Sequence, residues 1–248
     1  MKLNTKLRKL ILEAAFNAKH GHIPSALSIV ESIIAIHEIK HVDDIFILSK
    51  GHGCLAYYAY LCHIGEITES QLFNFGKKGN NLGGHPDRNK IKSVYASTGS
   101  LGHGLPIAVG TALAFKLKNK SNKVFCLIGD GESNEGSIWE SLSISKNLNL
   151  DNLTCVIDNN NSQIRSLPAI NLLEKFKSFG WKTVEVDGHD INSIKKCLSI
   201  ESDLPLAVIT NTKKGKGISD LENNMFGWHH KAPTEVELNK FIKELNEN

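Results

Sequence analysis

The sequence has no surplus of charge of one sign, no long apolar run and no paired cysteine motif. Its 248 residues carry 29 Lys and Arg against 26 Asp and Glu, a formal net charge of +3. That balance does not suit an electrostatic surface for nucleic acid or anionic lipid. The apolar stretch 105–117 is interrupted by Gly110 and Lys116 and falls short of the about 20 residues that span a bilayer. We expect no nucleic-acid partner and no membrane span.

The cysteines and the amino terminus predict the compartment. The five cysteines are odd in number and show no CxxC spacing, which favours buried free thiols in a reducing compartment over a disulfide framework. They are Cys54, Cys62, Cys126, Cys155 and Cys197. The first residues form a charged amphipathic segment without the apolar core of a signal peptide. We therefore predict a cytoplasmic protein.

Two common nucleotide-binding motifs are also missing. Neither a Walker A sequence nor GxGxxG occurs, and the glycine-rich stretch 99–104 has a different glycine order. This absence removes the main support for a nucleoside triphosphate or NAD site.

Hydrophobic periodicity predicts an α/β fold. Apolar residues at helical spacing predict helices near 7–15, 27–40, 53–63, 69–75, 103–118, 136–147, 169–179, 190–200 and beyond Thr234. Shorter β-branched or apolar runs predict strands at 124–128, 153–157, 182–186 and 206–210. Strands that alternate with helices are typical of parallel βαβ units. We predict a doubly wound, mostly parallel sheet flanked by helices, with residues 1–248 in a single domain.

Unusual polar residues follow two consecutive predicted strands. The first strand runs into Gly129-Asp130-Gly131 and the second into Asp158-Asn159-Asn160. Open α/β sheets bind ligands beyond the carboxyl ends of their strands, so Asp130 and Asn160 are expected to converge as hard oxygen ligands for Mg²⁺ or Ca²⁺. Amide groups at the following helix start suit an anion. The pattern indicates a metal and diphosphate site, although a GDG sequence alone also fits an ordinary strand-to-helix turn.

The GDG turn followed by paired asparagines resembles the metal and diphosphate motif of thiamine-diphosphate (ThDP) enzymes, and further motifs resemble transketolase. The stretch 18–22 is similar to the family's first GHP segment with Ile23 in place of proline, and 48–53 matches LSxGHG. Residues 84–86 match a second GHP. The stretch 99–104 resembles GPLGQG with Ser100 and His103 as departures, and 228–233 resembles WHGKAP with His230 in place of glycine.

The resemblance implies a role for each matching residue. The metal, Mg²⁺ or Ca²⁺, would be held by Asp130, Asn160 and the backbone carbonyl of Ser162. The diphosphate would meet His52, His229 and the amide of Gly131, the thiazolium would pack on Ile164, and the aminopyrimidine would meet the backbone at Gly99 and Leu101. The substrate would face the catalytic candidates His22, His85 and His103. The family's interface carboxylates, which couple paired cofactor sites, resemble Glu135 and Glu140. Both also fit a purely structural role, because acidic side chains are favoured near a helix amino terminus.

Most single histidines are surface or core residues, and the chain has 11 of them. We assign that ordinary role to His37, His41 and His63. We expect His189 to shape a helix start beside the natural N-cap Asp190. The roles of His20, His103 and His230 stay open. The lysines of 213–216 are assigned no role, because such charges usually belong to a solvated loop, and this stretch is expected to be mobile or ordered by ligand.

No second set of α/β strands follows the last predicted strand to bind the pyrimidine and supply the activating glutamate. The resemblance therefore implies the amino-terminal subunit of a split transketolase. This transferase would move a two-carbon ketol unit from a ketose or ketose phosphate to an aldose or aldose phosphate. Its partner would be a carboxy-terminal, pyrimidine-binding subunit in an α2β2 heterotetramer. Two alternatives remain: a subunit of another ThDP enzyme, such as a 2-oxo acid dehydrogenase α chain or a deoxyxylulose-phosphate synthase-like fragment, and a noncatalytic ThDP-binding regulatory module.

Overall fold

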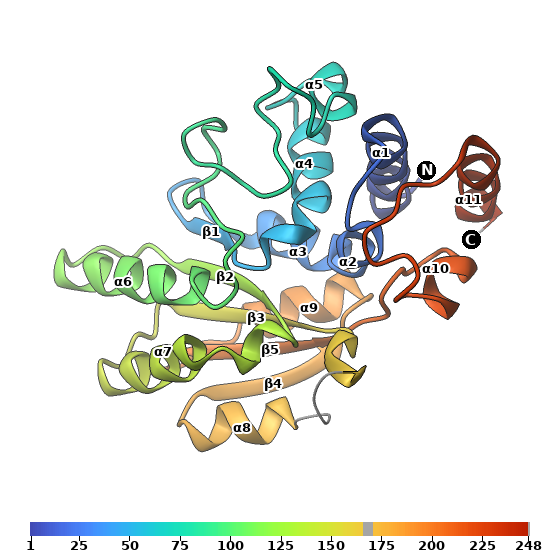
Figure 1. Ribbon diagram of the computed structural model, residues 1–248. Coiled ribbons are helices and arrows are strands. Elements are labelled where there is room, and N and C mark those ends of the chain that lie inside the picture. The colour runs from blue at the N-terminus through green and yellow to red at the C-terminus, as the bar shows by residue number, and fades with distance from the viewer. Residues whose placement is uncertain (166–170, 248) are drawn as a thin grey trace.

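The computed structural model describes residues 1–165 and 171–247, and a five-stranded parallel sheet lies at its centre (Figure 1). The strands are β1 (Ile45–Leu48), β2 (Val124–Gly129), β3 (Leu153–Asn159), β4 (Lys182–Asp187) and β5 (Leu206–Asn211). They pair in the order β1-β2-β3-β5-β4, and every pair is parallel. The predicted parallel α/β sheet is confirmed.

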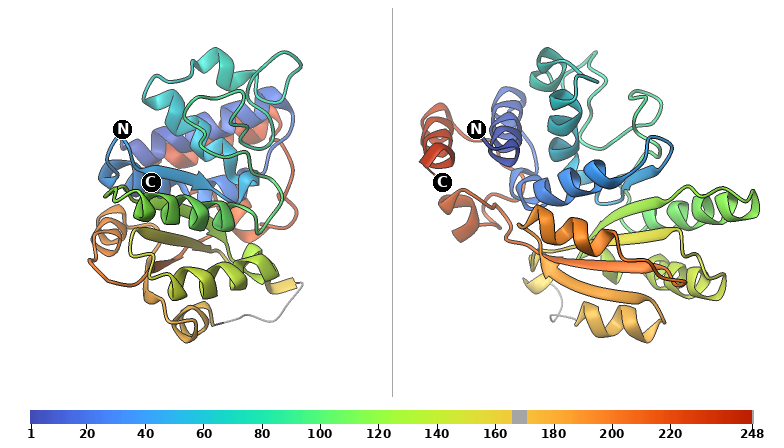
Figure 2. Two further views of the ribbon diagram at one scale, coloured as in Figure 1. Left: turned by 90° about the vertical axis from the view of Figure 1, so that its left-hand side faces the viewer. Right: turned by 180° about the vertical axis from the view of Figure 1, so that it is seen from behind.

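Helices cover both faces of the sheet, because successive buried side chains of a strand point to opposite faces. In β2, Phe125 and Leu127 join one apolar cluster, while Cys126 and Ile128 join another. The first cluster packs against helices of the amino-terminal region, α9 and α11. The second packs against α6, α7 and α8, and Figure 2 shows these two helical layers from behind. The sheet is thus buried from both sides, as parallel sheets usually are.

The helices connect the strands and form the amino-terminal layer. They are α1 (Leu3–Ala18), α2 (Ile23–Ser28), α3 (Val30–Ile39), α4 (Cys54–His63), α5 (Glu69–Phe73), α6 (Gly104–Leu117), α7 (Gly136–Asn147), α8 (Leu172–Ser178), α9 (Ile191–Leu198), α10 (Ser219–Asn223) and α11 (Glu235–Glu247). Short 3₁₀ helices occupy Gly51–Gly53, Glu132–Asn134 and Ser162–Arg165. Helix α11 returns to lie beside α1, so the two ends of the described chain meet (Figure 1).

Most predicted elements agree with the structure to within a few residues. The strand β1 and the helix α10 were not predicted, and the expected helix over 27–40 is two helices that meet at Ile29. The helix expected at 169–179 is α8, and its predicted first residues lie outside the described part of the chain. Both predicted capping boxes form, with Thr68 and Gln71 at α5 and Thr234 and Glu237 at α11.

No helix in residues 1–165 and 171–247 is long and apolar enough to cross a bilayer.

Candidate cofactor site

The carboxyl ends of four strands bring polar side chains to one edge of the sheet. Strand β1 leads into Lys50, β2 into Asp130, β3 ends beside Asp158, and β5 leads into Thr212. The register places Gly129 opposite Asp158, and Asp158 opposite Thr210. This edge is where open parallel sheets bind ligands.

Asp130 has one carboxylate oxygen engaged and one free. Its Oδ1 accepts hydrogen bonds from the Gly131 amide and the Ser162 hydroxyl, each at 2.8 Å. Its Oδ2 is buried and has no hydrogen-bond donor among the described residues. A buried acceptor without a donor is costly, and a divalent cation is a partner that a carboxylate oxygen would take. The site therefore fits a metal ion at this oxygen.

Asn160 is held so that its amide has a defined orientation. Its Nδ2 donates to Asp158 Oδ2 at 2.7 Å, and its Oδ1 accepts the Ser162 amide at 3.0 Å. The structure thus brings together the three residues predicted to hold the metal, Asp130, Asn160 and Ser162. A carboxylate, an amide oxygen and a backbone carbonyl are hard donors suited to Mg²⁺ or Ca²⁺. In the described part of the chain, no group of three or more His, Cys, Asp or Glu side chains is placed to hold a metal. The predicted ligand set contains only one such side chain, because its other members are an amide oxygen and a backbone carbonyl.

Glu132 ties a neighbouring loop to this edge and was not singled out from the sequence. Its Oε1 accepts from the Ser49 hydroxyl and from the Gly102 amide at 2.9 Å, and its Oε2 accepts from the Gly129 amide at 3.2 Å. Burial raises the pKa of Glu132, although the hydrogen bonds from Ser49, Gly102 and Gly129 oppose that shift. The carboxylate therefore fixes the loop 99–104 against the ends of β1 and β2.

Four histidines converge next to the strand ends. The ring of His22 lies 5.5 Å from that of His52, 5.2 Å from His229 and 4.6 Å from His230, measured between centroids. His20 continues the cluster, with its ring 5.9 Å from His230. The motifs around residues 20, 52 and 229, which are far apart in sequence, therefore form one surface.

The imidazoles of His22, His52, His85 and His229 are predominantly neutral near pH 7. Burial, followed by the neighbouring His230 and His229, lowers the pKa of His22 to about 4. Burial and the Lys50 ammonium lower the pKa of His52 to about 2. Burial also lowers the pKa of His85, and burial with the Lys214 charge lowers that of His229. Neutral imidazoles can donate and accept hydrogen bonds and transfer protons, but they supply no fixed positive charge.

Two buried lysines supply that charge, and one corrects the sequence analysis. Lys50 forms a buried ion pair with Asp158. Lys214, expected in a solvated loop, is only 3% exposed and lies 3.5 Å from His229 Nδ1. Burial and the Lys50 charge lower the pKa of Lys214 to about 8, against the opposing charges of Asp130 and Asp158. The sequence did not indicate that Lys214 is buried, because it stands in a run of lysines and glycines.

Of the two loop residues predicted to face the aminopyrimidine, Gly99 lies beside His85. Gly99 has φ of +145°, and a Cβ built there would lie 3.0 Å from His85 Cγ, so only glycine fits this approach. Leu101 is half-buried, and its carbonyl lies 3.0 Å from Nδ1 of the exposed His103. His103 is the residue before α6 and makes no ring contact with the histidine cluster among the described contacts.

The remaining predicted residues lie on the surface near the site. Ile164 is 57% exposed and stands two residues after Ser162, one of the predicted metal ligands. Glu135 and Glu140 are both exposed, at the N-cap of α7 and within its second turn. These positions are open to a cofactor or a partner chain, and their roles stay predictions. Asp190 caps α9 as predicted, with its side chain accepting the Asn192 and Ser193 amides.

The strand ends of this parallel sheet bring together a carboxylate with a free oxygen, oriented amides, neutral histidines and buried lysines. This arrangement fits the class of α/β proteins whose sheet edge takes a metal and a phosphorylated ligand. The particular family follows from comparison with known proteins. Residues 2–244 match the family model described as transketolase, thiamine diphosphate binding domain. The chain belongs to this family.

Relatives of two lengths match this chain. One of the subunits of the apulose-4-phosphate transketolase of Actinobacillus succinogenes is 37% identical, over 97% of this chain and 93% of that protein. The protein of the same name from Phocaeicola vulgatus is 33% identical, over 98% and 92%. The crystal structure of transketolase from Campylobacter jejuni superposes with a TM-score of 0.90 at 27% identity, over 98% of this chain and 42% of that chain. This chain therefore spans about two fifths of the length of that transketolase.

Proposed function

We propose that this chain is one subunit of a ThDP-dependent transketolase whose site is completed by a pyrimidine-binding partner subunit. The observation that carries the proposal is the buried Oδ2 of Asp130, which has no donor within the described residues. Ser162 bonds both Asp130 and Asn160, and Lys214, on which the Asp130 charge acts, lies against His229 of the histidine cluster. The family match supports ThDP as the cofactor. The two relatives that are named as transketolase subunits, matched over 93% and 92% of their length, support a two-chain enzyme.

Each part of the site would then have a defined task. Asp130, Asn160 and the Ser162 carbonyl would hold Mg²⁺ or Ca²⁺, which would neutralise the diphosphate together with the Lys214 ammonium. His52, His229 and the Gly131 amide would donate hydrogen bonds to the diphosphate, Ile164 would contact the thiazolium, and Gly99 and Leu101 would place the aminopyrimidine. When bound, ThDP supplies the carbon nucleophile. Glu135 and Glu140 would lie at the boundary between chains.

The histidines that face the substrate would move its protons. We assign this task to His22 and His85, with His103 as a further candidate. Their substrates would be a ketose donor and an aldose acceptor, free or phosphorylated, whose oxygens gain or lose protons as the two-carbon unit is transferred. The lowered pKa values of His22 and His85 keep a neutral ring available as a proton acceptor, and a positioned acid–base group of this kind accelerates a reaction by about 10²–10⁴-fold.

The partner and the setting form part of the proposal. By resemblance, two copies of each chain would form an α2β2 heterotetramer with a cofactor at each boundary between unlike chains. We place the enzyme in the cytoplasm, where free thiols persist; the five cysteines, all within the described residues, are free.

A reconstitution assay tests this function. The chain is mixed with its pyrimidine-binding partner, ThDP and Mg²⁺, and transfer is measured from ketose phosphates, with apulose 4-phosphate among the donors because the two relatives carry that name. We expect two-carbon transfer that requires both chains. Decarboxylation of a 2-oxo acid without ketol transfer would instead identify a 2-oxo acid dehydrogenase subunit. Cofactor binding without turnover of any donor would identify a noncatalytic module.

A further inference from the structure

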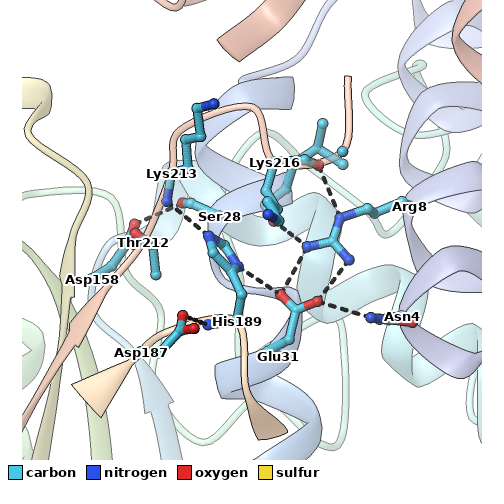
Figure 3. Close-up of polar contacts among 12 residues, drawn as sticks. Asn4, Arg8, Ser28, Glu31, Asp158, Asp187, His189, Thr212, Lys213 and Lys216 are labelled. Atoms are coloured by element: carbon cyan, nitrogen blue, oxygen red, sulfur yellow. Dashed lines mark hydrogen bonds and ion pairs between the residues drawn. The ribbon is translucent and has the colours of Figure 1, made fainter. Parts of the chain in front are cut away.

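The segment 212–217, which follows β5 and carries Lys214, is anchored by four other parts of the chain. The Thr212 hydroxyl donates to Asp158, and the Lys213 amide donates to His189 Nε2 at 2.8 Å. The Gly215 amide donates to the Pro24 carbonyl at 3.0 Å, and Arg8 Nε donates to the Lys216 carbonyl at 3.0 Å. Figure 3 shows the contacts of Thr212, Lys213 and Lys216 around His189. The backbone on both sides of Lys214 is therefore fixed.

A buried cluster of Arg8, Glu31 and His189 supports this segment. Arg8 Nη1 and Nη2 donate to the two oxygens of Glu31 at 2.7 and 2.8 Å, and the Glu31 side chain is 2% exposed. Glu31 Oε2 lies 3.3 Å from His189 Nδ1 (Figure 3). Burial alone would raise the pKa of Glu31, but the hydrogen bonds from His189 and Arg8 and the Arg8 charge lower it to about 2. Glu31 is therefore a carboxylate at neutral pH.

That carboxylate determines the tautomer of His189. An ionised carboxylate only accepts hydrogen bonds, so the proton of a neutral His189 ring lies on Nδ1, facing Glu31. Its Nε2 then has a free lone pair, which accepts the Lys213 amide. A carboxylate that bonds one ring nitrogen of a histidine commonly fixes the ring and so aims the other nitrogen.

The position of Lys214 depends on this anchoring. A lysine ammonium on a four-carbon stem is flexible and strongly hydrated, yet Lys214 is 3% exposed. It faces His229, and the charges of Asp130 and Asp158 act on it. Since burial of an ammonium is unfavourable, the backbone must hold it in place.

We propose that His189, oriented by Glu31 and Arg8, is a positioning residue that fixes the segment 212–217 so that Lys214 faces the diphosphate end of the cofactor. This inference rests on the proposed function and adds Arg8, Glu31 and His189 to it. Among the described hydrogen bonds, none joins these three residues to a predicted metal ligand. The Asp190 cap accounts for the start of α9, so the His189 ring is free for this second task.

A double-mutant cycle tests the coupling between His189 and Lys214. Calorimetry would measure the affinity of the full chain for magnesium pyrophosphate, and of the reconstituted complex for ThDP, in His189→Ala, Lys214→Met and the double variant. Each single substitution should weaken binding by about tenfold or more, the equivalent of one hydrogen bond to a charged group. The double variant should bind no more weakly than Lys214→Met. Additive losses, or wild-type affinity in His189→Ala, would overturn the proposal.

Two matched variants separate positioning from general destabilisation. Lys213→Ala removes an exposed cation that pairs with Glu222 but keeps the amide that donates to His189, so its affinity should equal that of the wild type. His189→Gln places an acceptor near the position of Nε2 and should restore affinity, whereas His189→Asn is too short and should not. Failure of glutamine to exceed asparagine would count against a role for Nε2.

Hydrogen exchange distinguishes this proposal from the proposed function. In His189→Ala the Lys213 amide should exchange at least about tenfold faster, since it loses its acceptor, while the β2 and β3 amides stay protected. Unchanged exchange at Lys213 would refute the positioning role whatever the activity. If the wild-type mixture transferred no ketol unit, the proposed function would fail, and the exchange result would still decide whether His189 anchors the segment.

Discussion

Asp130 offers a direct residue-level test of the metal site, because its buried Oδ2 has no donor in residues 1–165 and 171–247. Asp130→Ala should weaken metal-dependent ThDP binding by more than about 100-fold, the upper bound for residues that only support a metal ligand. Calorimetry on the reconstituted complex, with and without Mg²⁺, would measure this loss. Asp43→Ala, an exposed aspartate at the amino end of β1, is the control and should bind normally. Unchanged ThDP affinity in Asp130→Ala would show that Asp130 is not a metal ligand.

His85 and His229 should separate catalysis from cofactor binding. His85→Ala should lower ketol transfer by about 10²–10⁴-fold with little change in ThDP affinity, because we place its ring toward the substrate. His229→Ala should lower both, because its ring lies between His22 and Lys214. Steady-state kinetics with cofactor titration would measure the two effects, with His63→Ala as an exposed-histidine control. Wild-type activity in His85→Ala would show that His85 is not a catalytic residue.

His37 lies away from the site and should make the fold sensitive to acid. Its Nδ1 bonds the Ile33 carbonyl at 2.9 Å, and burial lowers its pKa from 6.5 to about 4. Above pH 6.5 the ring is neutral in both folded and unfolded states. Between pH 6.5 and 4 only the unfolded chain binds the proton, so stability falls by up to about 3 kcal/mol. Urea unfolding of His37→Phe should show a smaller loss over that range, and an equal loss would exclude His37 as the cause.

The sequence alone predicted those site residues that directly follow an apolar strand. Asp130 and Asn160 follow apolar strands directly, so their convergence could be predicted from the parallel sheet. Lys214 could not, because lysines are mostly solvated and its burial depends on anchors in α1, α2 and the β4–α9 turn. The same holds for His189, whose partners Glu31 and Lys213 are distant in sequence.

At the scale of elements, Glu132 should stabilise the loop 99–104. Glu132→Ala removes the acceptor for the Ser49 hydroxyl and for the Gly102 and Gly129 amides. Leaving buried donors unpaired should lower the free energy of unfolding by about 2–4 kcal/mol. Urea unfolding of the isolated chain would measure this, with the exposed Glu140→Ala as the control. A change below about 0.5 kcal/mol would show that other contacts hold the loop.

Element prediction succeeded where a buried segment was long. The strands β2, β3 and β5 each contain five continuous apolar or β-branched residues, and β4 has Thr183, Val184 and Val186 within six residues. Strand β1 has only four residues and lies before a glycine-rich turn. The break between α2 and α3 also escaped detection, because apolar periodicity continues across it. Its physical reason lies at Ser28, whose Oγ is 3.0 Å from the Ser25 carbonyl oxygen and 2.8 Å from Asp158 Oδ2 of β3, so its hydroxyl proton is shared between them. The chain bends there to reach the strand ends.

At the scale of the whole molecule, exposed apolar side chains favour a partner chain. Ile107 and Leu117 on α6 and Ile144 on α7 are 40%, 74% and 49% exposed, and Leu148, directly after α7, is 41% exposed. Helices α6 and α7 pack against each other. Apolar surface of this kind often marks an interface, and the predicted interface residues Glu135 and Glu140 lie at the start of α7.

The two-chain proposal leads to a test of stoichiometry. The residues that we assign to ThDP in this chain would contact its diphosphate, its metal and, through their backbone at Gly99 and Leu101, its aminopyrimidine ring. We assign proton transfer at the pyrimidine to the partner. The isolated chain should therefore be folded, prone to self-association through its apolar helices, and inactive. Activity should rise with partner concentration and saturate at an equimolar ratio, where light scattering should report two chains of each kind. If the isolated, monodisperse chain turned over a ketose donor and an aldose acceptor as fast as the mixture does, the proposed division of the site between two polypeptides would be wrong.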